Sequence, residues 1–437
     1  MHINTIQINN FRCFENFELS FRSGINVLIG DNASGKTSVL MACRQVLNAF
    51  FSGFSDENTS WLGLDDDDFR QVVRNGAILP DLPVRIAFSC TAEGLPPGQV
   101  FEVVKKSRRK GRILISPLAG YRDYSRHLAS GTYAGSGERL RPLPLFAFFS
   151  TEGIHKGSKV PVSKFKEYNH KPSFGYVECL NSRGLLPHWL SRLLVLEENG
   201  DATHEVAIVC SAVRRVLGDD GCGIIADVSV RPNRGKVFCM LKDGREVEAG
   251  LLSDGHRRLL GIVVDLAFRC ALLNRTAPGF GDETCLHTKG VVLMDEVDMH
   301  LHPGLQLRAL PSLKAAFPGL QFIATTHAPM VMTAIEDNAE NAVQYLKYDS
   351  VGQAYTASRV FTFGLDASSV NRLVLDMPAR NAEVEQQLAN LFRLIDAGRE
   401  LEARALLDSM RDRFGDTLPE LARAGAMLDF YMAGEDE

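Results

Sequence analysis

The sequence predicts an α/β protein: a main domain built on a mixed sheet with an antiparallel lobe, followed by a small helical domain. The first observation is the succession of a buried strand, a glycine-rich loop and a helix over residues 25–50. The second is two short apolar segments, 290–294 and 320–324, which each end in polar residues as parallel strands do. The third is a change near residue 356, beyond which apolar residues recur at helical spacing.

The composition is that of an ordinary globular protein. The chain has 437 residues, 45% hydrophobic and 23% charged, a length that favours two or three units. Nine cysteines without a C-x-x-C pair argue against a zinc site and a disulfide framework. No apolar run has the length of a membrane span, and the N-terminus lacks a basic region followed by an apolar core. We therefore expect an unprocessed cytoplasmic protein without a membrane contact.

The net charge of −5 conceals an asymmetry between the two ends of the chain. Residues 361–437 carry 15 Asp and Glu against 8 Lys and Arg, a net charge of −7. The acidic tail and the mildly basic body can therefore face different partners. Two basic stretches, 105–112 and 156–171, are typical of solvated surface, with phosphate or nucleic-acid contact as the alternative.

The elements follow from the pattern of apolar residues along the chain. The expected strands are 1–8, 17–21, 25–29, 84–91, 100–105, 112–116, 223–230, 236–241, 290–294 and 320–324. The expected helices are 39–50, 185–217, 251–274, 381–395, 400–413 and 418–431. No heptad repeat lies between the phosphate loop and residue 274, so we expect no long coiled-coil arm. The domains are then 1–355, with an antiparallel and basic insertion at about 84–175, and a helical domain, 356–437.

Two further segments carry expectations about burial. Residues 65–68 are four consecutive aspartates, and we expect a solvated loop there, because four adjacent carboxylates cannot all face one ion. A metal cluster is the alternative. In the tail, apolar positions exceed what three short helices bury among themselves, so we expect the main domain or a partner to cover part of them. These positions include Leu406, Leu407, Met410, Leu421 and Leu428.

Residues 30–37, Gly-Asp-Asn-Ala-Ser-Gly-Lys-Thr, fit the phosphate-loop pattern G-x-x-x-x-G-K-[ST] at every fixed position. Backbone N–H groups and the helix dipole at such a loop attract phosphates. Lys36 is expected to reach the β- and γ-phosphates, and the Thr37 hydroxyl to ligate Mg²⁺. The predicted nucleotide contacts are Asn32, Ala33, Ser34, Gly35, Lys36, Thr37 and Ser38. The alternative is a chance glycine-rich turn before a helix.

The two later apolar strands supply the acids and the histidine that phosphoryl transfer needs. Asp295 is expected to hold Mg²⁺ through water, and Glu296 to polarise the attacking water. His327, in Thr-Thr-His after a buried strand, is expected to reach the γ-phosphate, with a purely structural histidine as the alternative. Together with the phosphate loop, these residues predict ATP and Mg²⁺ as cofactors and hydrolysis of ATP.

Ser253, Asp254 and Gly255 open the helix over 251–274 and make a second helix N-terminus suited to an anion. Because the phosphate loop already surrounds the nucleotide of its own chain, we expect these residues to cap the γ-phosphate of a partner subunit's ATP. Two ATPs would then lie between two heads. A simple helix cap is the alternative. His300 and His302 are candidates for a metal pair, although a loop crossing the dimer interface is favoured.

Four motifs in a fixed order carry a resemblance to a known family. They are the phosphate loop, Leu-Ser-Asp-Gly at 252–255, Met-Asp-Glu-x-Asp-x-His-Leu-His-Pro at 294–303 and Thr-Thr-His-Ala-Pro at 325–329. In this order they resemble the ABC-type ATPase heads of the SMC, RecF and OLD group, over residues 1–335 or so. The compact head and the acidic helical tail, 380–428, resemble the PtuA-like ATPases of Septu and retron anti-phage systems.

The resemblance implies a homo-oligomer of head-to-head dimers or higher order that controls an HNH-type, PtuB-like nuclease. Nucleic acid, as DNA or retron msDNA, is a candidate partner. One departure concerns Asp254, because transporter ATPases have Leu-Ser-Gly-Gly-Gln here. A carboxylate beside a γ-phosphate is repulsive unless it turns to helix N–H groups or to Arg257 or Arg258. The alternatives are a RecF-like DNA-repair ATPase and an OLD-type nuclease, whose TOPRIM pattern is not seen after residue 335.

Overall fold

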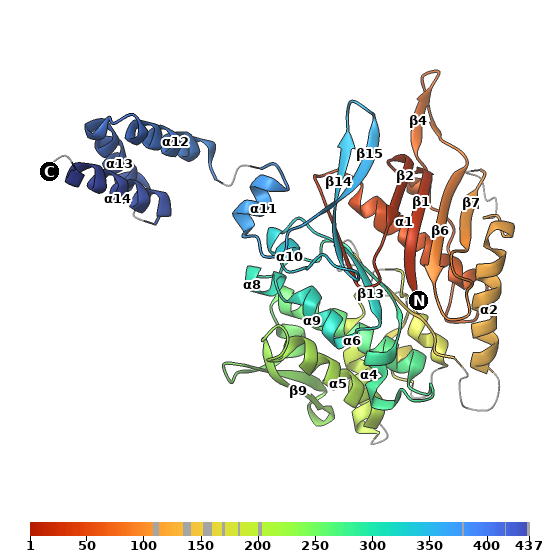
Figure 1. Ribbon diagram of the computed structural model, residues 1–437. Helices are drawn as coiled ribbons and strands as arrows, with labels where there is room; N and C mark the ends of the chain where they lie inside the picture. Colours follow the sequence, from red (N-terminus) through yellow and green to blue (C-terminus); the bar gives the residue numbers. More distant parts are fainter. Residues whose placement is uncertain are drawn as a thin grey trace. The chain divides into compact units, whose positions relative to one another are not determined.

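The computed structural model describes residues 1–107, 113–133, 141–151, 160–167, 171–181, 184–199, 203–377, 380–415 and 417–434. The chain divides into two compact units, Met1–Ala367 and Ser368–Glu437 (Figure 1). The division lies later than the boundary at 355 expected from the sequence, because strand β15 (Ala354–Val360) crosses that position and pairs with its neighbour β14. None of the helices in the described residues combines the length and apolar character that crossing a bilayer requires.

Unit 1 is centred on a six-stranded sheet in the order β15-β14-β3-β13-β12-β8. Its other strands are β3 (Ile25–Ile29), β8 (Leu145–Phe149), β12 (Gly290–Met294), β13 (Leu320–Thr325) and β14 (Ala342–Asp349). All pair in parallel except β15, which runs antiparallel to β14. Every residue of β3, β12 and β13 is buried, as the apolar runs predict. The predicted α/β fold with a mixed sheet is confirmed.

A four-stranded antiparallel sheet forms the second layer, in the order β2-β1-β6-β7. Its strands are β1 (His2–Phe11), β2 (Phe14–Ser20), β6 (Val84–Thr91) and β7 (Val100–Lys105). Helix α1 (Lys36–Ala49) packs against strands of both sheets. The strand predicted at 112–116 is wrong, because a 3-10 turn, Ser116–Leu118, closes this segment. Since β8 belongs to the six-stranded sheet, the segment 84–175 contributes to both sheets and is not a single antiparallel insertion.

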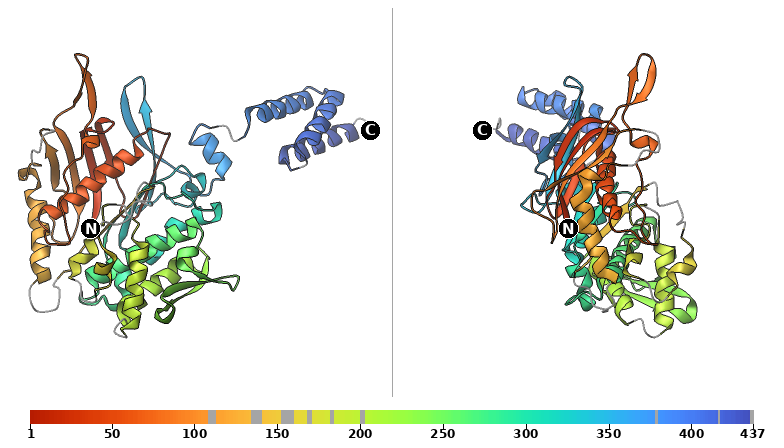
Figure 2. Two further views of the ribbon diagram at one scale, coloured as in Figure 1. Left: turned by 180° about the vertical axis from the view of Figure 1, so that it is seen from behind. Right: turned by 90° about the vertical axis from the view of Figure 1, so that its right-hand side faces the viewer.

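The remainder of unit 1 is a helical lobe with a small sheet, β11-β10-β9 (Figure 2). The strands of this small sheet are β9 (Ile225–Arg231), β10 (Lys236–Leu241) and β11 (Glu246–Glu248). The helices of unit 1 that follow α1 are α2 (Ala119–Tyr133), α3 (Val162–Phe165), α4 (Leu186–Glu198), α5 (Thr203–Leu217), α6 (Asp254–Asn274), α7 (Thr284–His287), α8 (Pro303–Gln306), α9 (Ala309–Ala316) and α10 (Pro329–Thr333). Helix α6 contains a buried ion pair between Arg269 and Asp265, with Nε and the carboxylate oxygen 2.7 Å apart. The Trp189 indole donates to the same carboxylate at 2.7 Å, which offsets the cost of burying the charge.

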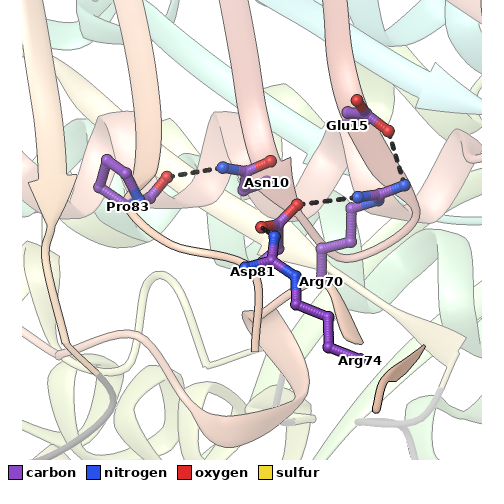
Figure 3. Close-up of polar contacts among 6 residues, drawn as sticks. All are labelled: Asn10, Glu15, Arg70, Arg74, Asp81 and Pro83. Carbon is purple, nitrogen blue, oxygen red and sulfur yellow. Dashed lines mark hydrogen bonds and ion pairs between the residues drawn. The ribbon is translucent and has the colours of Figure 1, made fainter. Parts of the chain in front are cut away.

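A two-stranded hairpin, β4 (Gln71–Arg74) and β5 (Ala77–Pro80), projects from unit 1 (Figures 1 and 2). Its base is held by ion pairs, drawn in Figure 3: the Arg70 guanidinium donates to Asp81 at 2.9 Å and to Glu15 at 2.7 Å. Arg74 donates to Asp81 at 2.8 Å. The contact of Arg70 with Glu15 joins the base of the hairpin to the start of β2.

Two expectations about solvated charge need correction. Asp68, the last of the four aspartates, is buried, because its carboxylate accepts hydrogen bonds from Arg12 at 3.0 Å and from Gln45 at 3.3 Å. Lys105, in a stretch expected to be solvated surface, is also buried, with Nζ donating to the Leu64 carbonyl at 3.3 Å. Residues 108–112, 156 and 159 of the two basic stretches lie outside the described residues.

Unit 2 begins within α11 (Ala367–Leu373) and contains α12 (Ala382–Asp396), α13 (Glu400–Phe414) and α14 (Pro419–Gly434). The helices share one core, whose buried members are Leu388, Leu391, Ile395, Ala403, Leu407, Met410, Leu421, Ala424 and Leu428. Leu406 packs against this core and is half-buried. The expectation that the tail needs cover from the main domain or a partner for these positions is therefore wrong: three amphipathic helices of this length bury them among themselves.

Candidate nucleotide site

The predicted site residues lie at the ends of three neighbouring parallel strands. Residues 30–37 follow β3, Thr326 and His327 follow β13, and Asp295 and Glu296 follow β12, with β13 between the other two. Backbone hydrogen bonds tie the strand ends together: Thr326 N–H donates to the β3 residue Leu28 at 3.2 Å, and Val297 N–H to Thr325 at 3.0 Å. Because the carboxyl ends of parallel strands lie at the same edge of a sheet, the three segments lie side by side at that edge.

The phosphate loop has the backbone that its glycines allow. Gly35 has φ 92° and Ala33 has φ 65°, both in the left-handed region. A Cβ at Gly35 would lie 2.6 Å from the ring of Phe14, so only glycine fits. Helix α1 begins at Lys36 without a side-chain cap on its N-terminus, which leaves backbone N–H groups for an anion. Asn32 is exposed and Ser38 is half-buried, on either side of this turn.

The Lys36 ammonium lies across the loop. Its Nζ donates to the carbonyls of Gly30 at 2.8 Å and Asp31 at 2.7 Å, and Ser34 Oγ is 3.4 Å away. Burial lowers the pKa of Lys36 below its ordinary value, and the carboxylates of Asp31 and Asp295 act in the opposite direction. The ammonium is thus held within the loop by oxygen acceptors, the kind of group that phosphates also supply.

Thr37 and Asp295 meet at the centre of the site. The Thr37 hydroxyl donates to the two Asp295 carboxylate oxygens at 3.3 and 3.4 Å. Thr325 Oγ1 donates to Asp295 Oδ1 at 2.7 Å. Mg²⁺ prefers oxygen ligands and is held in proteins by one or two side chains, with phosphates and water completing the shell. The Thr37 hydroxyl and the Asp295 carboxylate fit that role.

The backbone of Glu296 is held in a fixed conformation by hydrogen bonds. It has φ 47°, in the left-handed region that non-glycine residues rarely occupy. Its N–H donates to Thr325 Oγ1 at 2.8 Å and its carbonyl accepts from Arg258 at 2.9 Å. The side chain is exposed, as is that of His327. The backbone is therefore held on both sides while the carboxylate projects from the strand end.

Ser253, Asp254 and Gly255 lie at the N-terminus of α6. The Ser253 and Asp254 side chains are exposed, and Ser253 makes no side-chain cap. The Asp254 carboxylate accepts from Arg257 at 2.7 Å, so it does turn to one of the two arginines expected from the sequence. A Cβ at Gly255 would lie 2.3 Å from the His300 carbonyl, which shows how closely α6 approaches the loop after Glu296.

Hydrogen bonds hold the loop 298–303 at both of its ends. Asp298 accepts from the Thr326 hydroxyl at 2.5 Å, and His302 Nδ1 accepts from the Gly304 N–H at 3.3 Å as the cap of α8. Among the described residues, no group of three or more His, Cys, Asp or Glu is arranged to hold a metal ion. A His-x-His metal pair at His300 and His302 therefore lacks a third ligand there.

Sequence reasoning missed the roles that two residues have in the site. Thr325 bridges the two acidic positions through its hydroxyl, and the Thr-Thr-His motif named it without a role. Arg258 donates to the carbonyls of Asp295 at 3.0 Å, Glu296 at 2.9 Å and Met299 at 2.8 Å. Its position one residue after Arg257 gave no signal for this, because the contact joins segments far apart in the chain.

Family comparisons cover almost all of unit 1. The model of the "AAA ATPase domain" matches residues 1–81, which include the phosphate loop. The model described as "AAA domain, putative AbiEii toxin, Type IV TA system" matches residues 93–333, more than half of the chain. The second range contains Ser253, Glu296 and His327.

Relatives include "Retron Vc95 probable ATPase" of Vibrio cholerae serotype O1 biovar El Tor, 36% identical over 109 residues, 25% of this chain and 20% of that protein. "Septu protein PtuA" of Bacillus mycoides (strain KBAB4) is 36% identical over 86 residues, 20% of this chain and 11% of that protein. The matches thus span a fifth or less of these relatives. The predicted resemblance to retron and Septu ATPases is confirmed.

Among solved structures, the SMC head bound to the C-winged helix domain of ScpA aligns with 83% of this chain and 98% of its own. The sequence identity is 15% and the TM-score 0.47.

Proposed function

This chain belongs to the AAA domain family described as "AAA domain, putative AbiEii toxin, Type IV TA system", and we propose that it binds and hydrolyses ATP with Mg²⁺ as the ATPase of an anti-phage defence complex. The observation that carries the proposal is the convergence of Lys36, Thr37, Asp295 and Glu296 at one edge of the sheet. Phosphoryl transfer depends mainly on positioned charge, and these side chains supply it.

Each residue has a separate role in this reaction. Lys36 binds the β- and γ-phosphates, and Thr37 and Asp295 hold Mg²⁺, which neutralises phosphate charge. Glu296 orients and polarises the attacking water, since its carboxylate projects from a fixed backbone. His327, exposed at the end of β13, stabilises charge on the γ-phosphate.

The complete site needs a second copy of the chain. Ser253 and the N-terminus of α6 are exposed, and they cap the γ-phosphate of the partner subunit's ATP. The ion pair of Asp254 with Arg257 supports this arrangement, because it partly neutralises the carboxylate that departs from the transporter pattern. Two composite sites per dimer then couple nucleotide binding to closure of the heads.

We infer that closure controls a partner nuclease of the HNH type, and the similarity to a Septu and a retron protein supports a role in such a defence complex. DNA or retron msDNA is a further candidate ligand of the complex. The test is a phage-plating assay of the chain with its flanking genes, together with ATP hydrolysis by the purified complex. Protection that is lost when this chain is deleted supports the proposal. Sensitivity to DNA damage on deletion, without any effect on phage, would favour a RecF-like repair ATPase.

A further inference from the structure

We propose that Tyr348 and Tyr355, on the β14–β15 hairpin, stack against the purine base of the nucleotide held by the phosphate loop. The proposal rests on the proposed function for the nucleotide itself and adds the site of its base. Tyr348 and Tyr355 are direct cross-strand partners in the hairpin, so their rings lie on one face.

The hairpin lies directly beside the phosphate loop. β14 pairs in parallel with β3, and the pairing places Tyr345 opposite Ile29, the last residue before the loop. The continuing strand then passes Gly30, where a Cβ would lie 2.2 Å from the Leu346 carbonyl. Tyr348 follows two residues later. Figures 1 and 2 show the hairpin extending beyond the sheet at this edge.

A continuous line of rings joins the loop to Tyr348. The Phe14 ring lies against Gly35, at 2.6 Å from a Cβ placed there. The centroids of Phe14 and Tyr355 are 4.9 Å apart in an edge-on arrangement. Those of Tyr355 and Tyr348 are also 4.9 Å apart. The line of rings therefore starts at the phosphate loop and runs outward to Tyr348.

The outer end of this line is available to a ligand and the inner end is not. Phe14 is fully buried, whereas 45% of Tyr348 is exposed. Tyr355 is half-buried, and burial, followed by the adjacent Cys13 thiol, raises its pKa to about 12, so the ring is uncharged at neutral pH. An uncharged aromatic face beside an anion site suits a flat purine ring, and such stacking contributes about 1–3 kcal/mol per base.

The test compares ligands with and without a base on the full chain. Equilibrium binding of ATP and of inorganic tripolyphosphate is measured by calorimetry for the wild type, Tyr348→Ala and Tyr348→Phe. Phe361→Ala serves as the matched control, since Phe361 is an aromatic residue of similar setting with 73% exposure just after β15. Tyr348→Ala is expected to weaken ATP binding about tenfold or more, with tripolyphosphate binding unchanged. Tyr348→Phe and Phe361→Ala are expected to bind both ligands as the wild type does.

Unchanged ATP binding in Tyr348→Ala, or an equal loss for both ligands, would overturn the proposal and leave the pair a structural element of the hairpin. A wild type that binds neither ligand would instead contradict the proposed function. Photo-crosslinking of the wild type with 8-azido-ATP gives an independent readout that does not depend on a variant folding. Label on the hairpin, residues 342–360, is expected; label confined to other segments would also overturn the proposal.

Discussion

The hydroxyl of Thr325 lies 2.7 Å from Oδ1 of Asp295 and donates a hydrogen bond to it. The same hydroxyl oxygen, Thr325 Oγ1, accepts a hydrogen bond from the N–H of Glu296 at 2.8 Å. One buried side chain on β13 thus positions both acidic residues of the neighbouring strand end. In this arrangement Thr325 is a positioning residue, because it acts through the two acids.

Replacing Thr325 by Val keeps its shape but removes both hydrogen bonds. We expect the rate of Mg²⁺-dependent ATP hydrolysis to fall about 10–100-fold, the usual effect of losing a partner that orients a metal ligand. Thr325→Ser retains the hydroxyl and should hydrolyse ATP nearly as fast as the wild type. Equal rates for Thr325→Val and Thr325→Ser would show that the hydrogen bonds do not position the acids.

Lys36→Ala should weaken the binding of ATP. The substitution removes the charged donor that lies across the phosphate loop, and a charge-assisted hydrogen bond contributes about 1.5–3 kcal/mol. We therefore expect the ATP dissociation constant to rise about tenfold or more, measured by calorimetry. Lys164→Ala, at an exposed lysine, is the control. ATP affinity at the wild-type level in Lys36→Ala would exclude the loop as the phosphate site.

Ser253→Arg should block closure of the heads while each separate head still binds ATP, because bulk and charge are placed where the partner's γ-phosphate sits. Mixing this variant with Lys36→Ala creates hybrid dimers with one intact site and one doubly broken site. ATPase activity above that of either parent is the expected result in a steady-state assay. No recovery, with mixed dimers shown by differential tags, would count against a site shared between subunits.

Much of the nucleotide site was predictable because its signals are local. The phosphate loop is a continuous motif, and β12 and β13 are apolar runs that end in polar residues. The roles of Thr325 and Arg258 depend instead on strand order and on the approach of α6 to the loop after Glu296, which no short window contains. The hairpin that carries Tyr348 was also missed, since its strand β15 is half-exposed along most of its length and lacks an apolar run.

The tail shows the opposite error, in which the sequence suggested more exposure than exists. Leu407 and Met410 are buried inside the bundle of unit 2, since three helices can cover one another on their inner faces. A docking role for the tail then needs a test of its own.

A chain that ends after Ala367 should remain soluble and bind ATP, because every residue assigned to the nucleotide site lies in unit 1 and unit 2 has a separate core. A chain ending at Ala357, close to the domain boundary expected from the sequence, would cut β15 and lack Thr362, whose hydroxyl donates to the Met332 carbonyl at 2.7 Å. We expect the shortened chain to lose the nuclease in a pull-down assay. Undiminished pull-down would place the docking surface on unit 1, with the segment 105–171 as the first candidate.

The most direct test of the central claim is single-turnover hydrolysis of ATP by Glu296→Gln. The substitution removes only the carboxylate that polarises water, so ATP and Mg²⁺ should bind as in the wild type while hydrolysis slows about 100-fold or more. Glu336→Gln, at an exposed glutamate beyond β13, should hydrolyse ATP at the wild-type rate. Hydrolysis at the wild-type rate by Glu296→Gln would contradict the assignment of Glu296, at the end of β12, as the catalytic base.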